Sequence, residues 1–375
     1  MRKKLQIFLF FAFAILFLSL IFGTLYYHDF LKIWHIPKHG KYYLQSDMRT
    51  QAAGIINNYE FDSVILGSSM LENTSAKEAS NILGGKFFNI SISGSDLADK
   101  EVLLNYLLKK KSIKKVIISL DYDNRINFLH SETPDRSRYE FLYDNNNFND
   151  IKAYLNFKYL KCIFTPKKCV GKSRNFDMPN ETTSEFNYKF NGVKNWFKKI
   201  DDSDIRRFNQ IIEKANFIKN NQTSKTMIDD FNKSKENLDK YLISYAKNYK
   251  DTEFIVIVPA YSVIQSSIYL KYRDKNFNNL EKSLKYLIKN SKNLKNLKIY
   301  AFSNMDFIKN LNLYRDYGHY HSIINSKMLH LISDDIGLLN EENFDDYWAK
   351  FKQIANDFNI IEFGNKIEKY LNENR

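Results

Sequence analysis

The chain has 375 residues, of which 44% are apolar and 26% charged, so a folded protein with a sizeable core is expected and wholesale disorder is excluded. With only 12 glycines, 5 prolines and 2 cysteines, collagen-like, linker-type and disulfide-stapled compositions are excluded as well. The net charge is +13, but most basic residues are lysines spread among acidic ones, whereas proteins that read nucleic acids favour arginine. No nucleic-acid partner is therefore expected.

The N-terminal segment is long and apolar enough to cross a membrane. From Leu5 to Leu25 only a few polar residues interrupt the apolar ones, and a helix needs about 20 such residues to cross a hydrocarbon layer of about 30 Å. No Ala-x-Ala pattern follows, so an uncleaved anchor is favoured over a secretory signal. The alternative, a buried core helix, would need a polar face that this stretch lacks.

The residues on either side of this segment predict its orientation. Residues 2–4 are basic, which favours a cytoplasmic N-terminus, and Tyr26, Tyr27 and Trp34 suit the opposite interface. The predicted domains are a cytoplasmic tip and transmembrane anchor (1–27), a juxtamembrane segment (28–58) and an exported domain (59–375).

Export also affects how the two cysteines are interpreted. Cys162 and Cys169 lie seven residues apart, and a disulfide that closes such a small loop is permitted outside the cytoplasm. The alternative is two free, buried thiols.

Short β-branched apolar runs alternate with helical stretches along the exported domain. The runs predict buried strands at residues 61–67, 86–92, 113–120, 254–258 and 297–302. Helices are predicted between them at 72–83, 96–111 and 269–288. This alternation predicts an α/β fold with a parallel sheet. Residues 122–250, with helices expected at 205–219 and 226–249, are interpreted as a large insertion over the strand tips, where ligands bind in such sheets.

The first predicted strand ends in Gly67-Ser68-Ser69, which delivers a serine to the tip of the strand where a helix is expected to begin. Unsatisfied N–H groups and the positive end of a helix dipole would favour an oxyanion beside Ser69. The neighbouring strand ends near Gly94, whose N–H could be a second oxyanion donor. The alternatives are an ordinary turn and helix cap at Ser69, and at Gly94 a turn before a cap by Ser95 or Asp96.

A third candidate group lies near the C-terminus. Asp316 and His319 stand three residues apart in a predicted loop before an amphipathic helix. This spacing lets the carboxylate orient the imidazole while the other ring nitrogen faces a serine. His321 adds a His-x-His pair that could bind a metal with Asp316, but no other histidine lies in a convergent motif, so no metal is expected.

Together these residues resemble the SGNH (GDSL-like) hydrolase superfamily. The resemblance rests on Gly67-Ser68-Ser69 in place of Gly-Asp-Ser, on the Ser-Ile-Ser-Gly stretch that ends at Gly94, and on Asp316 and His319, and it spans residues 61–330. It implies a nucleophile at Ser69, a base at His319 and an orienting carboxylate at Asp316. The implied fold is a flavodoxin-like three-layer sandwich, and no cofactor is implied.

Four features look closer to one branch of this superfamily, the membrane-anchored proteins of surface-polymer acylation. They are the replaced aspartate, the uncleaved anchor, the strand end Val258-Pro259-Ala260-Tyr261 and the Gly-His-Tyr sequence at 318–320. This branch includes proteins similar to the alginate O-acetyltransferase accessory proteins and the teichoic-acid D-alanylation protein. The resemblance implies the inner (cytoplasmic) membrane of a bacterium, with the N-terminus inside and the main domain periplasmic. It also implies an acylated cell-surface carbohydrate as substrate and a multi-spanning membrane acyltransferase as partner.

One departure from the family pattern concerns the oxyanion hole. The family supplies an asparagine after the third strand, where this chain has Asp121, and Asn124 is the nearest asparagine. A carboxylate beside a developing oxyanion is unfavourable unless it is protonated or turned away. The third donor is therefore Asn124 or a residue of the insertion, or else the hole consists of the N–H groups of Ser69 and Gly94 alone.

Two functions follow from the sequence. The first is a membrane-anchored serine O-acyltransferase or esterase that acts on acyl groups of a cell-envelope carbohydrate. The second is a non-catalytic protein of the same fold that binds or assembles a surface polymer, which the missing asparagine supports.

Overall fold

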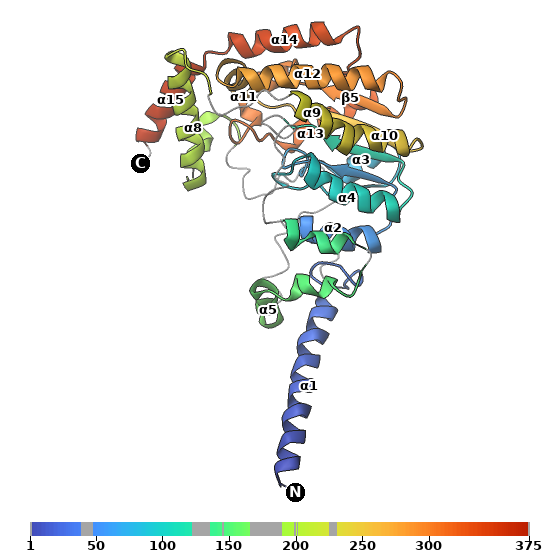
Figure 1. Cartoon of the computed structure of the whole chain (residues 1–375). Coiled ribbons are helices and arrows are strands. Elements are labelled where there is room, and N and C mark those ends of the chain that lie inside the picture. Colours follow the sequence, from blue (N-terminus) through green and yellow to red (C-terminus); the bar gives the residue numbers. More distant parts are fainter. Residues whose placement is uncertain are drawn as a thin grey trace. The chain divides into compact units, whose positions relative to one another are not determined.

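The computed structural model in Figure 1 divides the chain into two units, which are described separately. Unit 1 comprises Met1–Glu60, Val102–Lys111 and Thr133–Asn175, and unit 2 comprises Phe61–Glu101, Ser112–Glu132 and Phe176–Arg375. The structure describes residues 2–38, 48–121, 136–144, 146–165, 190–198, 200, 202–224 and 231–373.

Unit 2 is built on a five-stranded parallel sheet, which confirms the predicted α/β class. The strands are β1 (Ser63–Leu66), β2 (Phe87–Asn89), β3 (Lys115–Ser119), β4 (Glu253–Val258) and β5 (Leu297–Ala301). Four of them lie within predicted runs of β-branched residues, and β4 begins one residue before its predicted run. Nearly every strand residue is buried, as expected where helices cover both faces. The order is β2-β1-β3-β4-β5, the order found in flavodoxin-like sheets, in which ligands bind where the chain reverses direction, between β1 and β3.

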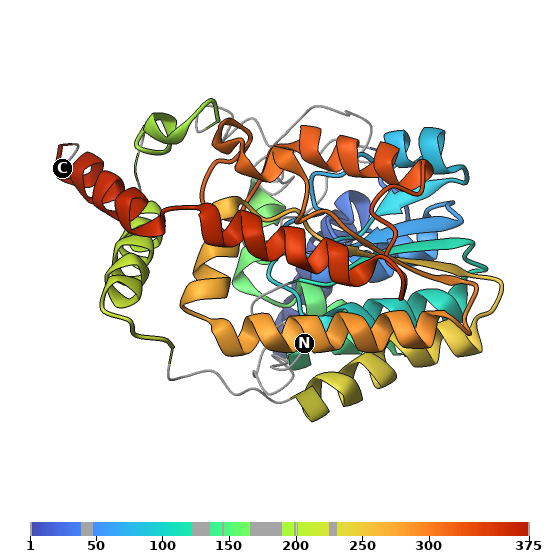
Figure 2. The same ribbon diagram turned by 90° about the horizontal axis from the view of Figure 1, so that it is seen from above.

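Helices cover the two faces of this sheet (Figure 2). On one face α3 (Ala76–Leu83) contacts α13 (Ser322–Ser333), and on the other α9 (Phe231–Leu238) contacts α12 (Asp274–Ser291). The remaining helices of unit 2 are α7 (Val193–Trp196), α8 (Asp202–Lys219), α10 (Ser244–Asn248), α11 (Val263–Lys271), α14 (Phe344–Asp357) and α15 (Ile360–Glu373), while α4 (Leu97–Lys110) runs through both units.

Three predicted helices differ from the observed ones. The helix expected from residue 72 begins only at Ala76, because Ser75 caps it by accepting a hydrogen bond from Glu78 N–H, and residues 69–73 form turns. Of the helix expected over 226–249, residues 226–230 lie outside the described residues, and the rest consists of α9, a π-helical turn over Asp239–Ile243, and α10. The helix expected over 269–288 is two helices, α11 and α12.

The predicted insertion is divided between the two units. In unit 2, α8 packs against α15 so closely that a Cβ on Gly364 would lie 2.4 Å from the Ala215 Cβ. The indole of Trp196 on α7 is buried and donates a hydrogen bond of 2.8 Å to the carbonyl of Tyr314. These contacts fix part of the insertion to the C-terminal helix and to the segment between β5 and α13.

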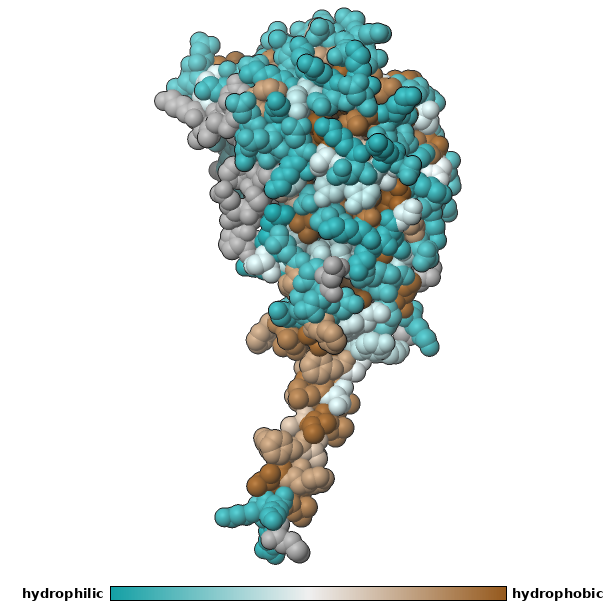
Figure 3. Space-filling model, turned by 45° about the vertical axis from the view of Figure 1, so that its right-hand side comes forward, coloured by the Kyte–Doolittle hydropathy of each residue, from teal (hydrophilic) through white to brown (hydrophobic). Residues whose placement is uncertain are grey.

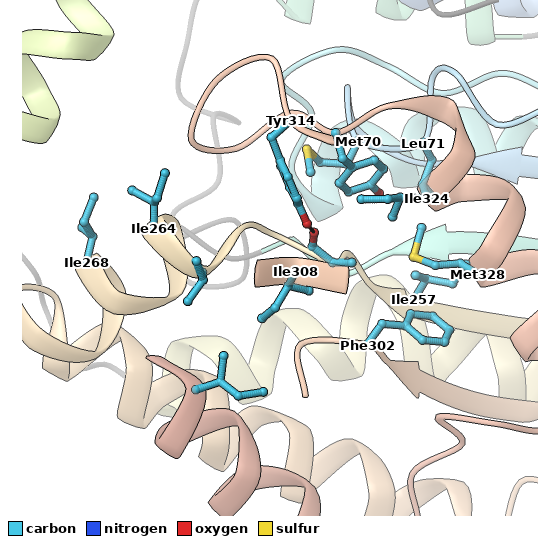
Figure 4. Close-up of a cluster of buried hydrophobic side chains, with 14 of the residues drawn as sticks. Met70, Leu71, Ile257, Ile264, Ile268, Phe302, Ile308, Tyr314, Ile324 and Met328 are labelled. Carbon is cyan, nitrogen blue, oxygen red and sulfur yellow. Dashed lines mark hydrogen bonds between the residues drawn. The ribbon is translucent and has the colours of Figure 1, made fainter. Parts of the chain in front are cut away.

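A buried apolar cluster joins the segment after β1 to the start of α13. Met70 and Leu71 follow β1, Tyr314 lies before α13, and Ile324 lies in its first turn, and all four side chains are buried in one cluster (Figure 4). The hydroxyl of Tyr314 donates a 2.7 Å hydrogen bond to the carbonyl of Ala260, after β4. This packing holds segments that are far apart in sequence at fixed positions.

Unit 1 contains the predicted membrane segment. It forms α1 (Arg2–His28), and in the described part of the chain this is the one helix long and apolar enough to cross a membrane. Its large apolar side chains are exposed and are coloured brown in Figure 3. Unit 1 also contains α2 (Met48–Asn58), α5 (Phe157–Phe164) and short 3₁₀ turns at Arg136–Arg138, Glu140–Tyr143 and Asp150–Tyr154.

The cysteine prediction falls partly within the described residues. Cys162, on α5, is disulfide-bonded. Cys169, the other cysteine of the sequence, lies outside the described residues.

The Tyr314 hydroxyl provides a test of the packing between β4 and the loop before α13. Tyr314→Phe leaves the carbonyl of Ala260 without its buried partner, and we expect the free energy of unfolding to fall by about 1–3 kcal/mol. Denaturant unfolding of the detergent-solubilised chain measures this. Tyr317→Phe is the matched control, because its hydroxyl binds Gln210 at an exposed position, and an equal loss in both variants would contradict the expectation.

Candidate active site

The structure brings Ser69, His319 and Asp316 together at the carboxyl edge of the sheet in unit 2. The Oγ of Ser69 lies 3.1 Å from Nε2 of His319. On the other side of the ring, Nδ1 lies 2.9 Å from Oδ2 and 3.1 Å from Oδ1 of Asp316. In the tautomer with the proton on Nδ1, the imidazole donates to Asp316 and Nε2 can accept the hydrogen bond of the serine hydroxyl.

A short backbone hairpin explains why a spacing of three residues suffices. The Oδ1 of Asp316 accepts hydrogen bonds from the N–H groups of Gly318 at 2.8 Å and His319 at 2.7 Å, as aspartate side chains do in turns. An antiparallel bridge between Tyr314 and Tyr320 closes the hairpin. The turn therefore sets the imidazole beside the carboxylate.

Two arginines, as well as His319, lie close to the Asp316 carboxylate. Its side chain is buried, and its Oδ2 lies 3.0 Å from the guanidinium of Arg207 and 3.8 Å from that of Arg315. Burial alone would raise the pKa of this carboxyl, but His319, Arg207 and Arg315 hold the pKa well below its usual value. Asp316 is thus a carboxylate at neutral pH.

Arg207 was not anticipated from the sequence. It lies on α8, in the predicted insertion, and nothing in its local pattern distinguishes it from its neighbour Arg206. Only the packing of α8 in unit 2 places it against Asp316.

The three side chains differ in their access to solvent. Ser69 is partly exposed and the His319 side chain is 28% exposed, whereas the Asp316 side chain is only 6% exposed. A nucleophile and base that can reach a ligand, with a shielded carboxylate behind them, is the arrangement that acyl transfer requires.

The turn that carries Ser69 is fixed from two neighbouring strands. Gly67 N–H donates to the Ser91 hydroxyl at 2.9 Å, beyond β2, and Ser68 N–H donates to the Ser119 hydroxyl at 3.0 Å, at the end of β3. The side-chain amide of Asn89 donates to the carbonyls of Leu71 and Thr74, both at 2.9 Å. These bonds replace the helix that was expected to begin at Ser69, so the predicted helix dipole does not act there.

A buried ion pair lies beneath this turn. The side chains of Asp121 and Lys100 are 3% and 1% exposed and pair at 2.8 Å. The Asp121 carboxylate also accepts hydrogen bonds from the hydroxyls of Ser68 at 2.6 Å, Ser119 at 2.7 Å and Tyr261 at 3.1 Å. Burial would raise the pKa of Asp121, but Lys100 and the two serines lower it.

A carboxylate that pointed at an oxyanion would be unfavourable, but the Asp121 carboxylate is turned toward Lys100 and Ser68. The Lys100 ammonium compensates its charge. Sequence reasoning missed Lys100, although a lysine within an otherwise apolar helix face after Gly94 was the available signal.

Of the predicted oxyanion donors, the structure describes Ser69 and Gly94 but not Asn124. Gly94 is exposed and has a φ of +67°, and a Cβ there would meet nothing within 4 Å, so the requirement for glycine is conformational. Asp96 caps α4 by accepting a 2.8 Å hydrogen bond from Asp99 N–H, as the alternative interpretation of this motif stated. Asn124 lies outside the described residues.

The His321 side chain caps α13 and packs on a neighbouring ring. Its Nδ1 accepts a 3.1 Å hydrogen bond from Ile323 N–H at the start of α13, and its ring packs on Phe190 with centroids 4.7 Å apart. Within the described ranges, no group of three or more His, Cys, Asp or Glu side chains could hold a metal ion.

No protein-family model matches the chain, and comparisons with curated proteins and with solved structures likewise found no match. The chemistry of the site is therefore inferred from its own residues.

The Lys100 and Asp121 pair predicts a large loss of stability when one partner is removed. Lys100→Met leaves a buried carboxylate uncompensated, and we expect the free energy of unfolding to fall by about 3–5 kcal/mol. Adding Asp121→Asn removes the charge and should restore part of this loss, although some hydrogen bonds to the serines weaken. Denaturant unfolding of the two variants measures the difference, and a double variant no more stable than Lys100→Met would contradict it.

Proposed function

We propose that the protein is a serine-dependent acyl-transfer enzyme. The observation that carries the proposal is the hydrogen-bonded series Ser69, His319 and Asp316, with contacts of 3.1 Å and 2.9 Å on the two sides of the imidazole. Nucleophile, base and orienting group in this order are the requirement for covalent catalysis by serine.

In the proposed reaction, Ser69 attacks the carbonyl carbon of an ester as His319 Nε2 takes the hydroxyl proton. The carbonyl oxygen becomes an oxyanion, which the N–H groups of Ser69 and Gly94 receive. The tetrahedral intermediate collapses as its C–O bond to the leaving alcohol breaks, and the alcohol takes the proton from His319. A sugar hydroxyl or water then attacks the acyl carbon while His319 takes its proton, the bond from the acyl carbon to Ser69 Oγ breaks, and His319 returns the proton to Ser69.

The proposed family is the SGNH type, in its membrane-anchored branch. The strand order and the Gly67-Ser68-Ser69 and Asp316-x-x-His319 motifs support it. The proposed location is the bacterial inner membrane, with the N-terminus inside and unit 2 in the periplasm. The proposed substrate is an acylated cell-envelope carbohydrate, and an acyl donor delivered by a multi-spanning membrane acyltransferase would explain the anchor.

Asp121 is held in an ion pair and hydrogen bonds, and this affects whether the proposed acyl-enzyme reacts with a sugar hydroxyl or with water. If the oxyanion hole consists of the N–H groups of Ser69 and Gly94 alone, it has one donor fewer than the family pattern, which typically costs about 3–4 kcal/mol of transition-state stabilisation. Such a loss slows attack by water and favours a well-positioned sugar hydroxyl. The same feature supports the second candidate, a non-catalytic protein that binds or assembles a surface polymer.

A fluorophosphonate probe separates the two candidates. The intact protein should become covalently labelled at Ser69, and Ser69→Ala and His319→Ala should lose the label, because the serine is nucleophilic only beside its base. Ser333→Ala and His330→Ala, exposed on α13, are matched controls that should keep it. Absence of labelling in the folded, unsubstituted protein would favour the binding protein.

Arg207 predicts how this labelling depends on pH. Arg207 is one of the charges that hold the pKa of Asp316 low, so Arg207→Ala should raise that pKa, and labelling should be lost at a higher pH as the solution is acidified. Arg206→Ala, the exposed neighbour on α8, should leave the profile unchanged. A profile for Arg207→Ala that stays at the original pH would show that the guanidinium does not act on the carboxylate.

A further inference from the structure

Helix α5 of unit 1 lies against the C-terminal end of α1 (Figure 1). It spans Phe157–Phe164, and its N-terminus is capped by Asn156, whose side chain accepts a 3.2 Å hydrogen bond from Tyr159 N–H. The helix is short and follows the 3₁₀ turn that ends at Tyr154.

The inner face of α5 is fixed to the segment that directly follows α1. The ring of Tyr159 stacks on Phe30 with centroids 6.3 Å apart, and Tyr154 stacks on Trp34 at 4.9 Å. The Tyr154 hydroxyl donates to Asp29 at 2.5 Å and accepts from Leu31 N–H at 2.8 Å. These ring contacts and hydrogen bonds therefore fix the position of α5 along the axis of α1.

The outer face of α5 carries a row of exposed apolar side chains, called the apolar stripe below. Phe157, Leu160 and Phe164 are three and four residues apart, so they share one side of the helix. They are 79%, 36% and 78% exposed, and Leu155, just before the helix, is 57% exposed. A soluble surface rarely gathers large apolar side chains in this way.

Charged and aromatic residues lie where a membrane interface would place them. Lys158 and Lys161 flank the stripe and are exposed, and the Lys161 ammonium lies 5.7 Å from the Phe157 ring centroid. At the end of α1, Tyr26 and Tyr27 are 56% and 55% exposed. Tyrosines at the end of a spanning helix and lysines beside an apolar stripe both suit the headgroup region.

We propose that α5 is an interfacial helix that lies in the headgroup region of the leaflet where α1 ends, with Phe157, Leu160 and Phe164 in the lipid. The occupant of the stripe is the phospholipid bilayer, because the stripe is fixed beside the end of a helix whose own apolar surface needs the same bilayer. In Figure 3 the apolar surface of α1 continues onto the adjacent part of unit 1. The proposal needs α1 to span a membrane and does not depend on the acyl-transfer chemistry.

An interfacial α5 gives the anchor a second attachment point. A single helix can rotate about its axis and tilt, whereas a spanning helix joined to a helix in the membrane plane fixes the orientation of unit 1. The lysines would add attraction to anionic headgroups.

Depth-dependent quenching of tryptophan fluorescence tests the proposal. Phe157→Trp and Phe164→Trp are made in the full chain and reconstituted into phosphatidylcholine and phosphatidylglycerol vesicles with acyl chains brominated at shallow or deep positions. The signal is the emission of each variant minus that of the unsubstituted protein. Lys158→Trp is the matched control, on the same helix but off the stripe, and Leu16→Trp reports the middle of α1.

We expect shallow bromines to quench the introduced tryptophans of Phe157→Trp and Phe164→Trp by a roughly two-fold larger fraction than that of Lys158→Trp, since an interfacial helix buries its apolar face about 5–10 Å into the boundary of headgroups and acyl chains. Deep bromines should quench Leu16→Trp most. Quenching of both stripe variants no greater than that of Lys158→Trp would overturn the proposal and indicate water or a protein partner on the stripe. Unquenched Leu16→Trp would overturn it by removing the membrane helix, whereas loss of fluorophosphonate labelling alone would leave it standing.

Discussion

The proposed site depends on how one buried carboxylate is compensated. A charge as shielded as that of Asp316 is stable only if it is paired and hydrogen-bonded. It meets this condition with the backbone N–H groups of Gly318 and His319, the His319 ring and the Arg207 guanidinium. The same contacts that compensate the charge also form the hairpin, orient the imidazole and fix α8 against the site.

A second buried carboxylate sits beneath the nucleophile turn. Asp121 follows β3, and Lys100 pairs with it. Because Ser68 donates to this carboxylate and its N–H binds Ser119, the ion pair positions the residue next to Ser69. The cluster therefore makes the turn rigid.

Unit 1 also contains a buried carboxylate that is compensated by hydrogen bonds. Asp29, directly after α1, accepts hydrogen bonds from the N–H groups of Ile33, Trp34 and His35 as well as from the Tyr154 hydroxyl. The carboxylate turns the chain after α1 and holds the segment against which α5 packs.

The sequence by itself determined the features that depend on local pattern. The five buried strands, the membrane-length helix and the placement of Ser69, Asp316 and His319 at element ends follow from runs of apolar residues and from spacings of a few residues. The tertiary structure alone decided the start of α3 at Ala76, because the Asn89 side chain binds carbonyls of the turn after β1 and Ser75 caps the helix. It also decided the pairing of Arg207 with Asp316 and of Lys100 with Asp121, and which face of α5 is exposed. Those outcomes depend on contacts between segments far apart in the chain, and a charge or an apolar face shows no local sign of the partner that folding will bring to it.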